Sequence, residues 1–146
     1  MRKMNDERLT ALRNKLIEET LDNKLNSYIG LEILELNPNY IKTRIKFCED
    51  VLNTYGSIHG GSLLALADVS GGMVGCMCGY YVTTVSANLN FLLPALNTEY
   101  IYCECMKLKT GRHILVFDVR ITDDKGNLLD SGEFSYFASK KSVLEE

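Results

Sequence analysis

Three kinds of segment are missing from this 146-residue sequence, and each absence excludes a class of protein. No dense run of basic residues occurs and the formal net charge is -3, so a nucleic acid is not expected as the main partner. No apolar stretch follows the charged N-terminal residues, so we expect no secretory signal and a cytoplasmic location. No internal repeat, low-complexity tract or linker divides the chain, and we expect residues 1–146 to form a single domain.

The five cysteines are an odd number in a chain without an export signal, which argues against a disulfide framework. Cys76 and Cys78 are separated by one residue, as are Cys103 and Cys105, whereas zinc knuckles and thioredoxin-like redox sites use a two-residue gap. We therefore expect reduced cysteines that pack in the core, and neither a metal site nor a bound cofactor. A nucleophile pair of a cysteine with His59 has no support from the spacing.

The first part of the chain predicts one helix and two strands. Leucine and isoleucine recur at helical spacing among charges from about residue 6 to residue 26, which predicts an amphipathic N-terminal helix. Residues 40–47 alternate strictly, with Lys42, Arg44 and Lys46 on one face, as in a half-exposed strand whose inner face carries Ile41, Thr43, Ile45 and Phe47. A preceding strand is expected at residues 30–36, with a turn at 37–39.

Residues 60–79 are apolar nearly all round, which is the pattern of a helix buried on every side. The segment is long enough to resemble a membrane span, but its six glycines, its central Asp68 and the strands after it argue against that interpretation. Asp68 is its only charge. Because a buried ionised carboxylate is costly without a partner, we interpret Asp68 as catalytic.

Four segments rich in β-branched and aromatic residues follow this helix, and short turns separate them. Short links predict an antiparallel meander, and a meander of this length can wrap a single apolar helix. The expected architecture is α+β and looks like the hotdog fold, with a core at about residues 30–139 and an additional N-terminal helix. The predicted strands are residues 82–93, 99–109, 113–122 and 127–139.

One combination of residues is more specific than this fold pattern. The segment 53–61 reads Asn-Thr-Tyr-Gly-Ser-Ile-His-Gly-Gly, an aspartate lies nine residues after its histidine, a serine lies eighteen residues after that aspartate, and residues 91–95 read Phe-Leu-Leu-Pro-Ala. With these features the chain resembles the acyl-CoA thioesterases of the hotdog superfamily, in particular the phenylacetic-acid-degradation type. The resemblance covers about residues 30–139.

This resemblance implies a role for each of five residues. Asp68 would be the nucleophile or the general base, and Gly60 would donate its backbone N–H to the thioester carbonyl. His59 and Asn53 would shape and polarise that side of the site, while Ser86 would position the attacking water. The implied substrate is an acyl- or aryl-acetyl-coenzyme A, so that coenzyme A is part of the substrate and no separate cofactor is expected.

The spacing of Gly60 and Asp68 adds a geometric argument that is independent of the resemblance. Eight residues of helix span about 12 Å at roughly 1.5 Å per residue, so one small reacting group cannot touch both within a single chain. We therefore expect antiparallel copies of the helix to form a homodimer with two shared sites. Such dimers would pair into a tetramer, in an arrangement that the sequence leaves open.

Each assignment has a structural alternative. In these alternatives His59 would close the helix start, Asn53 would shape a turn, and Ser86 would face solvent beside Asn88 and Asn90. Aromatic residues near the helix either line an acyl tunnel or simply pack, and basic residues in the later strands either anchor coenzyme A phosphates or form a solvated face. The aromatic residues are Tyr55, Tyr80 and Tyr81. The basic residues are Lys107, Lys109, Arg112, His113 and Arg120.

Two other functions compete with hydrolysis. A hotdog dehydratase or hydratase would also use a histidine and a carboxylate, but its histidine would act as the main base, whereas glycine directly after His59 suits carbonyl polarisation better. A non-catalytic acyl-CoA sensor on the same fold would have no need of Asp68 in its buried helix. The length and branching of the acyl group stay open.

Overall fold

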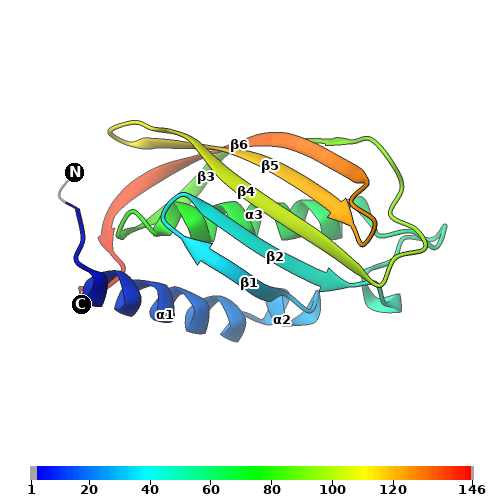
Figure 1. Ribbon diagram of the computed structural model, residues 1–146, viewed down its shortest axis with the longest axis horizontal. Helices are drawn as coiled ribbons and strands as arrows, with labels where there is room; N and C mark the ends of the chain where they lie inside the picture. The colour runs from blue at the N-terminus through cyan, green and yellow to red at the C-terminus, as the bar shows by residue number, and fades with distance from the viewer. Residues whose placement is uncertain (1–2, 146) are drawn as a thin grey trace.

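The computed structural model describes residues 3–145 as three α-helices, one short 3-10 helix and six strands. The helical elements are α1 (Asp6–Asp22), α2 (Lys24–Tyr28), η1 (Glu49–Val51) and α3 (Gly60–Cys76). The strands are β1 (Glu32–Asn37), β2 (Tyr40–Lys46), β3 (Tyr80–Phe91), β4 (Tyr100–Thr110), β5 (Ile114–Asp123) and β6 (Leu128–Ser142). The predicted elements are therefore present in the predicted order (Figure 1).

The six strands form one sheet in the order β1-β2-β4-β5-β6-β3, with every neighbouring pair antiparallel. The expectation of a four-strand meander after the buried helix is correct for β4, β5 and β6 and wrong for β3, which pairs with β6 at the opposite edge from β1. The link between β3 and β4, residues 92–99, explains the difference. Eight extended residues reach about 26 Å at roughly 3.3 Å per residue, enough to cross the end of the domain.

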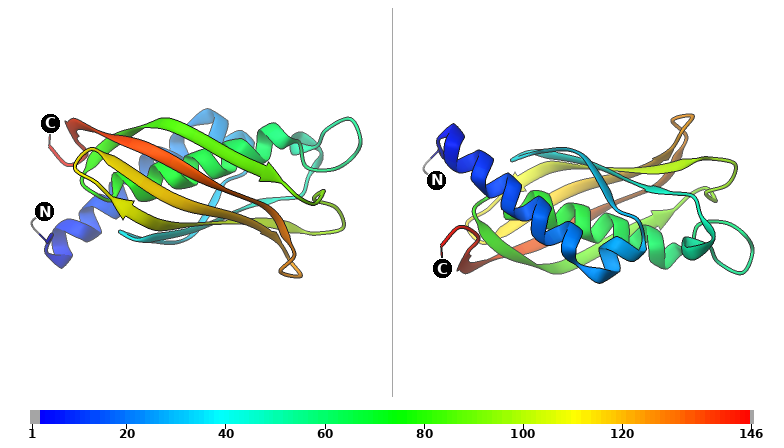
Figure 2. Two further views of the ribbon diagram at one scale, coloured as in Figure 1. Left: turned by 90° about the horizontal axis from the view of Figure 1, so that it is seen from above. Right: turned by 90° about the horizontal axis from the view of Figure 1, so that it is seen from below.

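The helix α3 lies between the sheet and α1. It runs behind the strands in Figure 1, and the view from below in Figure 2 shows α1 crossing the opposite side of α3. Leu63, Leu66 and Ala67 of α3 are buried, but Leu64 is 40% exposed, so the expectation of a helix buried on every side is wrong within a single chain. The α+β fold with a sheet wrapped around one central helix is thus confirmed, although α3 ends at Cys76 instead of residue 79.

The predicted N-terminal helix of residues 6–26 is two helices. α1 ends at Asp22 because Asn23 adopts an extended backbone with ψ 130°. The Asn23 side chain then accepts a hydrogen bond from the Asn26 N–H and so caps the start of α2. Leu12 and Leu16 form the buried face of α1.

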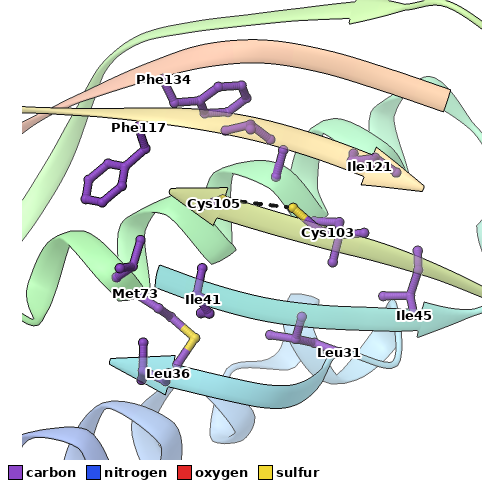
Figure 3. Close-up of a cluster of buried hydrophobic side chains, with 14 of the residues drawn as sticks. Leu31, Leu36, Ile41, Ile45, Met73, Cys103, Cys105, Phe117, Ile121 and Phe134 are labelled. Carbon is purple, nitrogen blue, oxygen red and sulfur yellow. Dashed lines mark hydrogen bonds between the residues drawn. The ribbon is translucent and has the colours of Figure 1, made fainter. Parts of the chain in front are cut away.

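The core lies between α3 and the inner face of the sheet (Figure 3). The predicted inner face of β2 is confirmed for Ile41, Thr43 and Ile45, which are all buried, whereas Phe47 lies just beyond the end of β2 and is half-buried. The one polar member of that face is satisfied, because the Thr43 and Ser70 hydroxyl oxygens lie 2.7 Å apart and Ser70 also donates to the Leu66 carbonyl. All five cysteines are free, and Cys76, Cys103 and Cys105 are buried. Among residues 3–145, no helix is long and apolar enough to cross a membrane.

Candidate active site

The start of α3 is organised by His59. Its Nδ1 atom accepts a hydrogen bond of 2.8 Å from the Gly61 N–H, so His59 is the N-cap of the helix. Since Nδ1 acts as an acceptor, the neutral ring carries its proton on Nε2, and the side chain is exposed. The Gly60 N–H has no hydrogen-bond partner within residues 3–145 and lies in the first turn of the helix, where the positive end of the dipole favours negative charge.

Asn53 holds the loop that leads into α3. Its Oδ1 atom accepts from the Tyr55 N–H at 2.8 Å and from the Ser57 N–H at 3.2 Å, while Nδ2 donates to the Ser57 hydroxyl at 2.8 Å. The turn-shaping alternative for Asn53 is therefore visible in the structure. One amide hydrogen of Nδ2 is left over for a ligand.

Asp68 is half-buried on α3 and uses one of its two carboxylate oxygens for structure. Oδ1 accepts from the Thr84 hydroxyl at 2.7 Å and from the Tyr136 hydroxyl at 3.3 Å. Oδ2 accepts no hydrogen bond from the described residues 3–145. The carboxylate is thus held in one orientation with a free oxygen, which suits a general base or a nucleophile.

Tyr136 reaches Asp68 because Gly71 leaves room for it. The Tyr136 hydroxyl donates to the Asp68 backbone carbonyl at 3.0 Å as well as to the side chain. A Cβ atom at Gly71 would lie 2.2 Å from this hydroxyl oxygen, so no larger residue fits there without displacing Tyr136. Burial, and then the Asp68 charge, raise the pKa of Tyr136 above its ordinary value, so the hydroxyl stays a donor.

Ser86 lies on the other face of the sheet from Asp68. The β3–β6 register shifts between Thr84 and Ser86, and Ser86 pairs with Ser135. Successive strand residues face opposite sides, and the neighbours of Ser135 on β6, Phe134 and Tyr136, are buried on the side of α3. Ser86 is accordingly exposed on the outer face, and its predicted role in positioning water stays a prediction.

A cavity of about 320 Å³ opens beside Asp68, between α3, β3 and α1. Val69, Met73 and Val82 contribute apolar surface, and Thr84 and Tyr136 border it next to Asp68. Of the three tyrosines considered as tunnel residues, Tyr81 lines this cavity, whereas Tyr55 and Tyr80 are exposed. Because Asp68 lines the cavity, a small molecule bound there would lie beside its side chain.

The predicted site residues therefore fall into three places. Asn53, His59 and Gly60 lie together at the start of α3, Asp68 lies eight residues further along the same helix, and Ser86 lies on the outer sheet face. Within one chain the structure does not bring the first group to Asp68. Sequence reasoning missed Thr84 and Tyr136, the two residues that contact the carboxylate. Strand alternation alone would put Thr84 on the same face as Ser86. The register shift between these two residues turns Thr84 toward Asp68, and the sequence does not reveal such a shift.

No group of three or more histidine, cysteine, aspartate or glutamate residues in the described part of the chain is arranged to hold a metal ion. Of the basic residues considered for coenzyme A, Arg120 is paired with Asp118 at 3.1 Å and borders an open hollow on the outer sheet face with Asn88 and Asn90. This hollow is on the side of the sheet away from α3.

Residues 55–129, just over half of the chain, match the family model described as the thioesterase superfamily. A proposed esterase of Haemophilus influenzae is 24% identical over 115 residues, which cover 77% of this chain and 83% of that protein. A proposed esterase of Thermoplasma acidophilum is 23% identical over 111 residues, 75% of this chain and 83% of that protein.

Solved structures share the fold over most of the chain. A thioesterase of Haemophilus influenzae has a TM-score of 0.77 at 22% identity and covers 99% of this chain and 96% of its own. The E. coli PaaI protein from the phenylacetic acid degradation operon has a TM-score of 0.81 at 16% identity, covering 90% and 98%. A hypothetical thioesterase of Streptococcus pneumoniae, solved with coenzyme A, has a TM-score of 0.79 at 23% identity, covering 86% and 98%.

Proposed function

The chain belongs to the thioesterase superfamily and is a thioester hydrolase, and we propose that it hydrolyses acyl-coenzyme A with Asp68 as the catalytic carboxylate. Water adds its oxygen to the acyl carbon, the carbon–sulfur bond breaks, and a proton passes to the sulfur, giving the free acid and coenzyme A. The structural relative solved with coenzyme A supports this choice of thioester. No step of this reaction requires a metal ion or a separate cofactor.

The main support for this proposal is the hydrogen bonding of the two Asp68 carboxylate oxygens. Thr84 and Tyr136 fix one oxygen, and the other oxygen is free at a cavity of ligand size. A carboxylate kept only for folding would gain from having both oxygens paired. The free oxygen either takes a proton from water or attacks the acyl carbon directly, and both routes use the same group.

The start of α3 provides the second half of the chemistry. Its free Gly60 N–H would stabilise the negative charge that develops on the thioester oxygen, and the Nε2–H of the exposed His59 would be a further donor. Because Nδ1 of His59 is occupied by the Gly61 N–H and Nε2 carries the proton, this histidine is not a base in this state. That arrangement favours hydrolysis over a dehydratase with a histidine base.

The two halves combine in a homodimer. Gly60 and Asp68 are about 12 Å apart along α3, so the donors of one chain would serve the carboxylate of the other. Each dimer would then contain two composite sites, and pairing of dimers would give a tetramer. The protein would act on acyl-coenzyme A in the cytoplasm, with no nucleic acid or membrane as partner.

The decisive experiment measures coenzyme A release from a panel of acyl-CoAs with a thiol reagent, comparing wild type with Asp68→Asn. The substitution is nearly isosteric and removes only the charge, so turnover should fall at least about a hundredfold. Asp118→Asn, the same substitution on the outer sheet face, is the matched control and should keep its rate. A near wild-type rate for Asp68→Asn would show that another group activates water.

A further inference from the structure

The cavity beside Asp68 has a polar wall that hydrolysis itself does not use. The C-terminal part of α1 and the turn into α2 supply this wall, whereas Leu16, Val69, Met73 and Val82 make other surfaces apolar. Its members are Glu19, Thr20, Asn23 and Asn26. An apolar wall would be sufficient for a plain hydrocarbon chain, so the polar wall indicates a substrate with a polar group.

Most of the hydrogen-bonding capacity of this wall is free. The Thr20 hydroxyl, the Asn23 Nδ2 and the Asn26 Oδ1 have no hydrogen-bond partner within residues 3–145. The other atoms of the two asparagines are used, because Asn23 Oδ1 caps α2 and Asn26 Nδ2 donates to the Thr20 carbonyl at 3.0 Å. The wall, in which Asn23 is exposed and Thr20 and Asn26 are half-buried, therefore offers both donors and acceptors to a ligand.

The charged member of the wall is already paired. Both carboxylate oxygens of Glu19 accept from the Tyr81 hydroxyl, at 2.9 Å and 2.8 Å, and Lys15 lies 3.8 Å away. Glu19 thus already has a hydroxyl donor and a cationic neighbour, and its charge and that of Asp68 disfavour an anionic ligand. A hydroxyl group is neutral, donates one hydrogen bond and accepts others, which matches the free atoms of Thr20, Asn23 and Asn26.

We propose that Thr20 and Asn23 are specificity-determining residues that select a short acyl group carrying a hydroxyl at the end remote from the thioester. This inference rests on the proposed hydrolysis of acyl-coenzyme A at Asp68. The part of the site that one chain supplies has a volume of about 320 Å³, at the small end of the roughly 300–1,000 Å³ range of ligand pockets, and a short acyl group fits this part. Because α1 supplies the wall, the N-terminal helix acquires a role in choosing the substrate.

The test compares matched pairs of substrates: butyryl-, hexanoyl- and octanoyl-CoA and their ω-hydroxy counterparts. The readout is the ratio of kcat/KM between the members of each pair. Thr20→Val keeps the shape and removes the hydroxyl, and Asn23→Ser removes the amide while keeping a side chain that caps α2. Thr10→Val, the same substitution at an exposed position of α1 outside the cavity, is the control.

Wild type and Thr10→Val should prefer the hydroxylated member of at least one pair. Thr20→Val and Asn23→Ser should each lower that preference about tenfold, the scale of one neutral hydrogen bond. Equal kcat/KM for both members in wild type overturns the inference. So does an equal loss for every substrate, because it would place Thr20 and Asn23 against coenzyme A.

Calorimetric binding of the same acyl-CoAs separates this inference from the proposed reaction. If the wild type hydrolyses none of these acyl-CoAs, the proposed function fails. The role of the wall would still be supported if the wild type bound an ω-hydroxy member more tightly than its plain counterpart and Thr20→Val abolished this difference. Equal affinities for both members of every pair would overturn the inference whatever the rates are.

Discussion

At the scale of single residues, the arrangement around Asp68 is asymmetric. One oxygen receives two hydroxyl donors and the other receives none from residues 3–145. Thr84 donates to Oδ1 at 2.7 Å, whereas Tyr136 shares its single proton between Oδ1 at 3.3 Å and the Asp68 backbone carbonyl at 3.0 Å, so Thr84 contributes more to the orientation that leaves Oδ2 without a partner. Both donors come from the sheet, and the position of the reactive group therefore depends on how β3 and β6 pair.

Thr84 and Ser86 give contrasting predictions. Thr84→Val removes the 2.7 Å hydrogen bond to Asp68 and should lower turnover about tenfold or more, with KM little changed. Ser86→Ala should have a smaller effect, because Ser86 lies on the outer face of the sheet. Steady-state kinetics of the two variants measure the difference. A larger loss for Ser86→Ala would support the predicted water-positioning role and place Ser86 closer to the reaction than Thr84.

Asp130 is a second unusual carboxyl group, with no surface accessible to solvent. Its side chain is fully buried and both carboxyl oxygens lack a hydrogen-bond partner among residues 3–145. Burial raises its pKa to about 7, from an ordinary value of about 4. Below pH about 4 both the folded and the unfolded chain are protonated here, and above pH about 7 both are ionised. Between these values only the unfolded chain loses the proton.

Stability should therefore fall as pH rises from about 4 to about 7, because the unfolded state binds fewer protons there. A shift of about three pH units corresponds to about 4 kcal/mol of unfolding free energy. Asp130→Asn removes the ionisation, so the variant should gain stability over wild type at pH about 8 and gain much less at pH about 4. Urea denaturation at both pH values measures this. An equal difference at the two pH values would contradict a raised pKa.

For helices and strands, the sequence predicts which side of a strand is buried better than it predicts which strands pair in the sheet. Alternation identified the buried side of β2 correctly, since burial of Ile41, Thr43 and Ile45 depends only on the two-residue period. The same period places Ser86 on one face with Asn88 and Asn90, and all three are exposed, as the solvent-facing alternative expects. It failed for Thr84, because the irregularity between Thr84 and Ser86 turns Thr84 to the other face and belongs to the pairing of β3 with β6. Strand order failed for a similar reason, as short links do not reveal that residues 92–99 cross the end of the domain.

The same limit applies to the site. Asp68 and the start of α3 were recognised because they are close in sequence and differ from their apolar surroundings. Tyr136 was missed because it lies 68 residues after Asp68, and only the fold brings the two together. The break between α1 and α2 was also missed. Asparagine alone is not a strong signal for the end of a helix, and only the structure shows that the Asn23 side chain caps α2.

Gly71 and Gly72 of α3 provide a matched pair for testing the contact with Tyr136. In Gly71→Ala the added Cβ would meet the buried Tyr136 ring, whereas in Gly72→Ala the nearest ring atom is 3.8 Å away. Alanine favours helix by about 0.5–1 kcal/mol at both positions, but overpacking costs about 1–3 kcal/mol at Gly71. We expect thermal denaturation to show a lower Tm for Gly71→Ala only, together with reduced turnover. Equal Tm values would show that Tyr136 moves freely.

At the scale of the whole molecule, β3 lies at an edge of the sheet with no partner strand beyond it among residues 3–145. Val85 and Phe91 of this strand and the following Leu92 are exposed, at 59%, 55% and 56%. A long exposed strand edge with apolar side chains is prone to association. A second copy that pairs along β3 would cover it and would bring the second α3 close, as the composite site requires.

Subunit exchange tests that composite site. His59→Ala lacks the cap of α3 on the donor side, and Asp68→Asn lacks the carboxylate, so each homodimer should be strongly impaired. The two proteins are mixed, denatured and refolded together. If each site combines His59 and Gly60 of one chain with Asp68 of the other, a mixed dimer contains one site with both lesions and one intact site.

Random pairing makes about half of the dimers mixed, and one of two sites in each is intact, so activity near a quarter of wild type is expected. Coenzyme A release before and after exchange measures the recovery, and native mass spectrometry of subunits labelled with different isotopes verifies the pairing. The control mixes Asp68→Asn with Asp118→Asn, whose mixed dimers keep one intact site under either model and show that exchange preserves activity. Verified exchange of the first pair with no recovery would mean that the donors and the carboxylate act within one chain, against the 12 Å helix geometry.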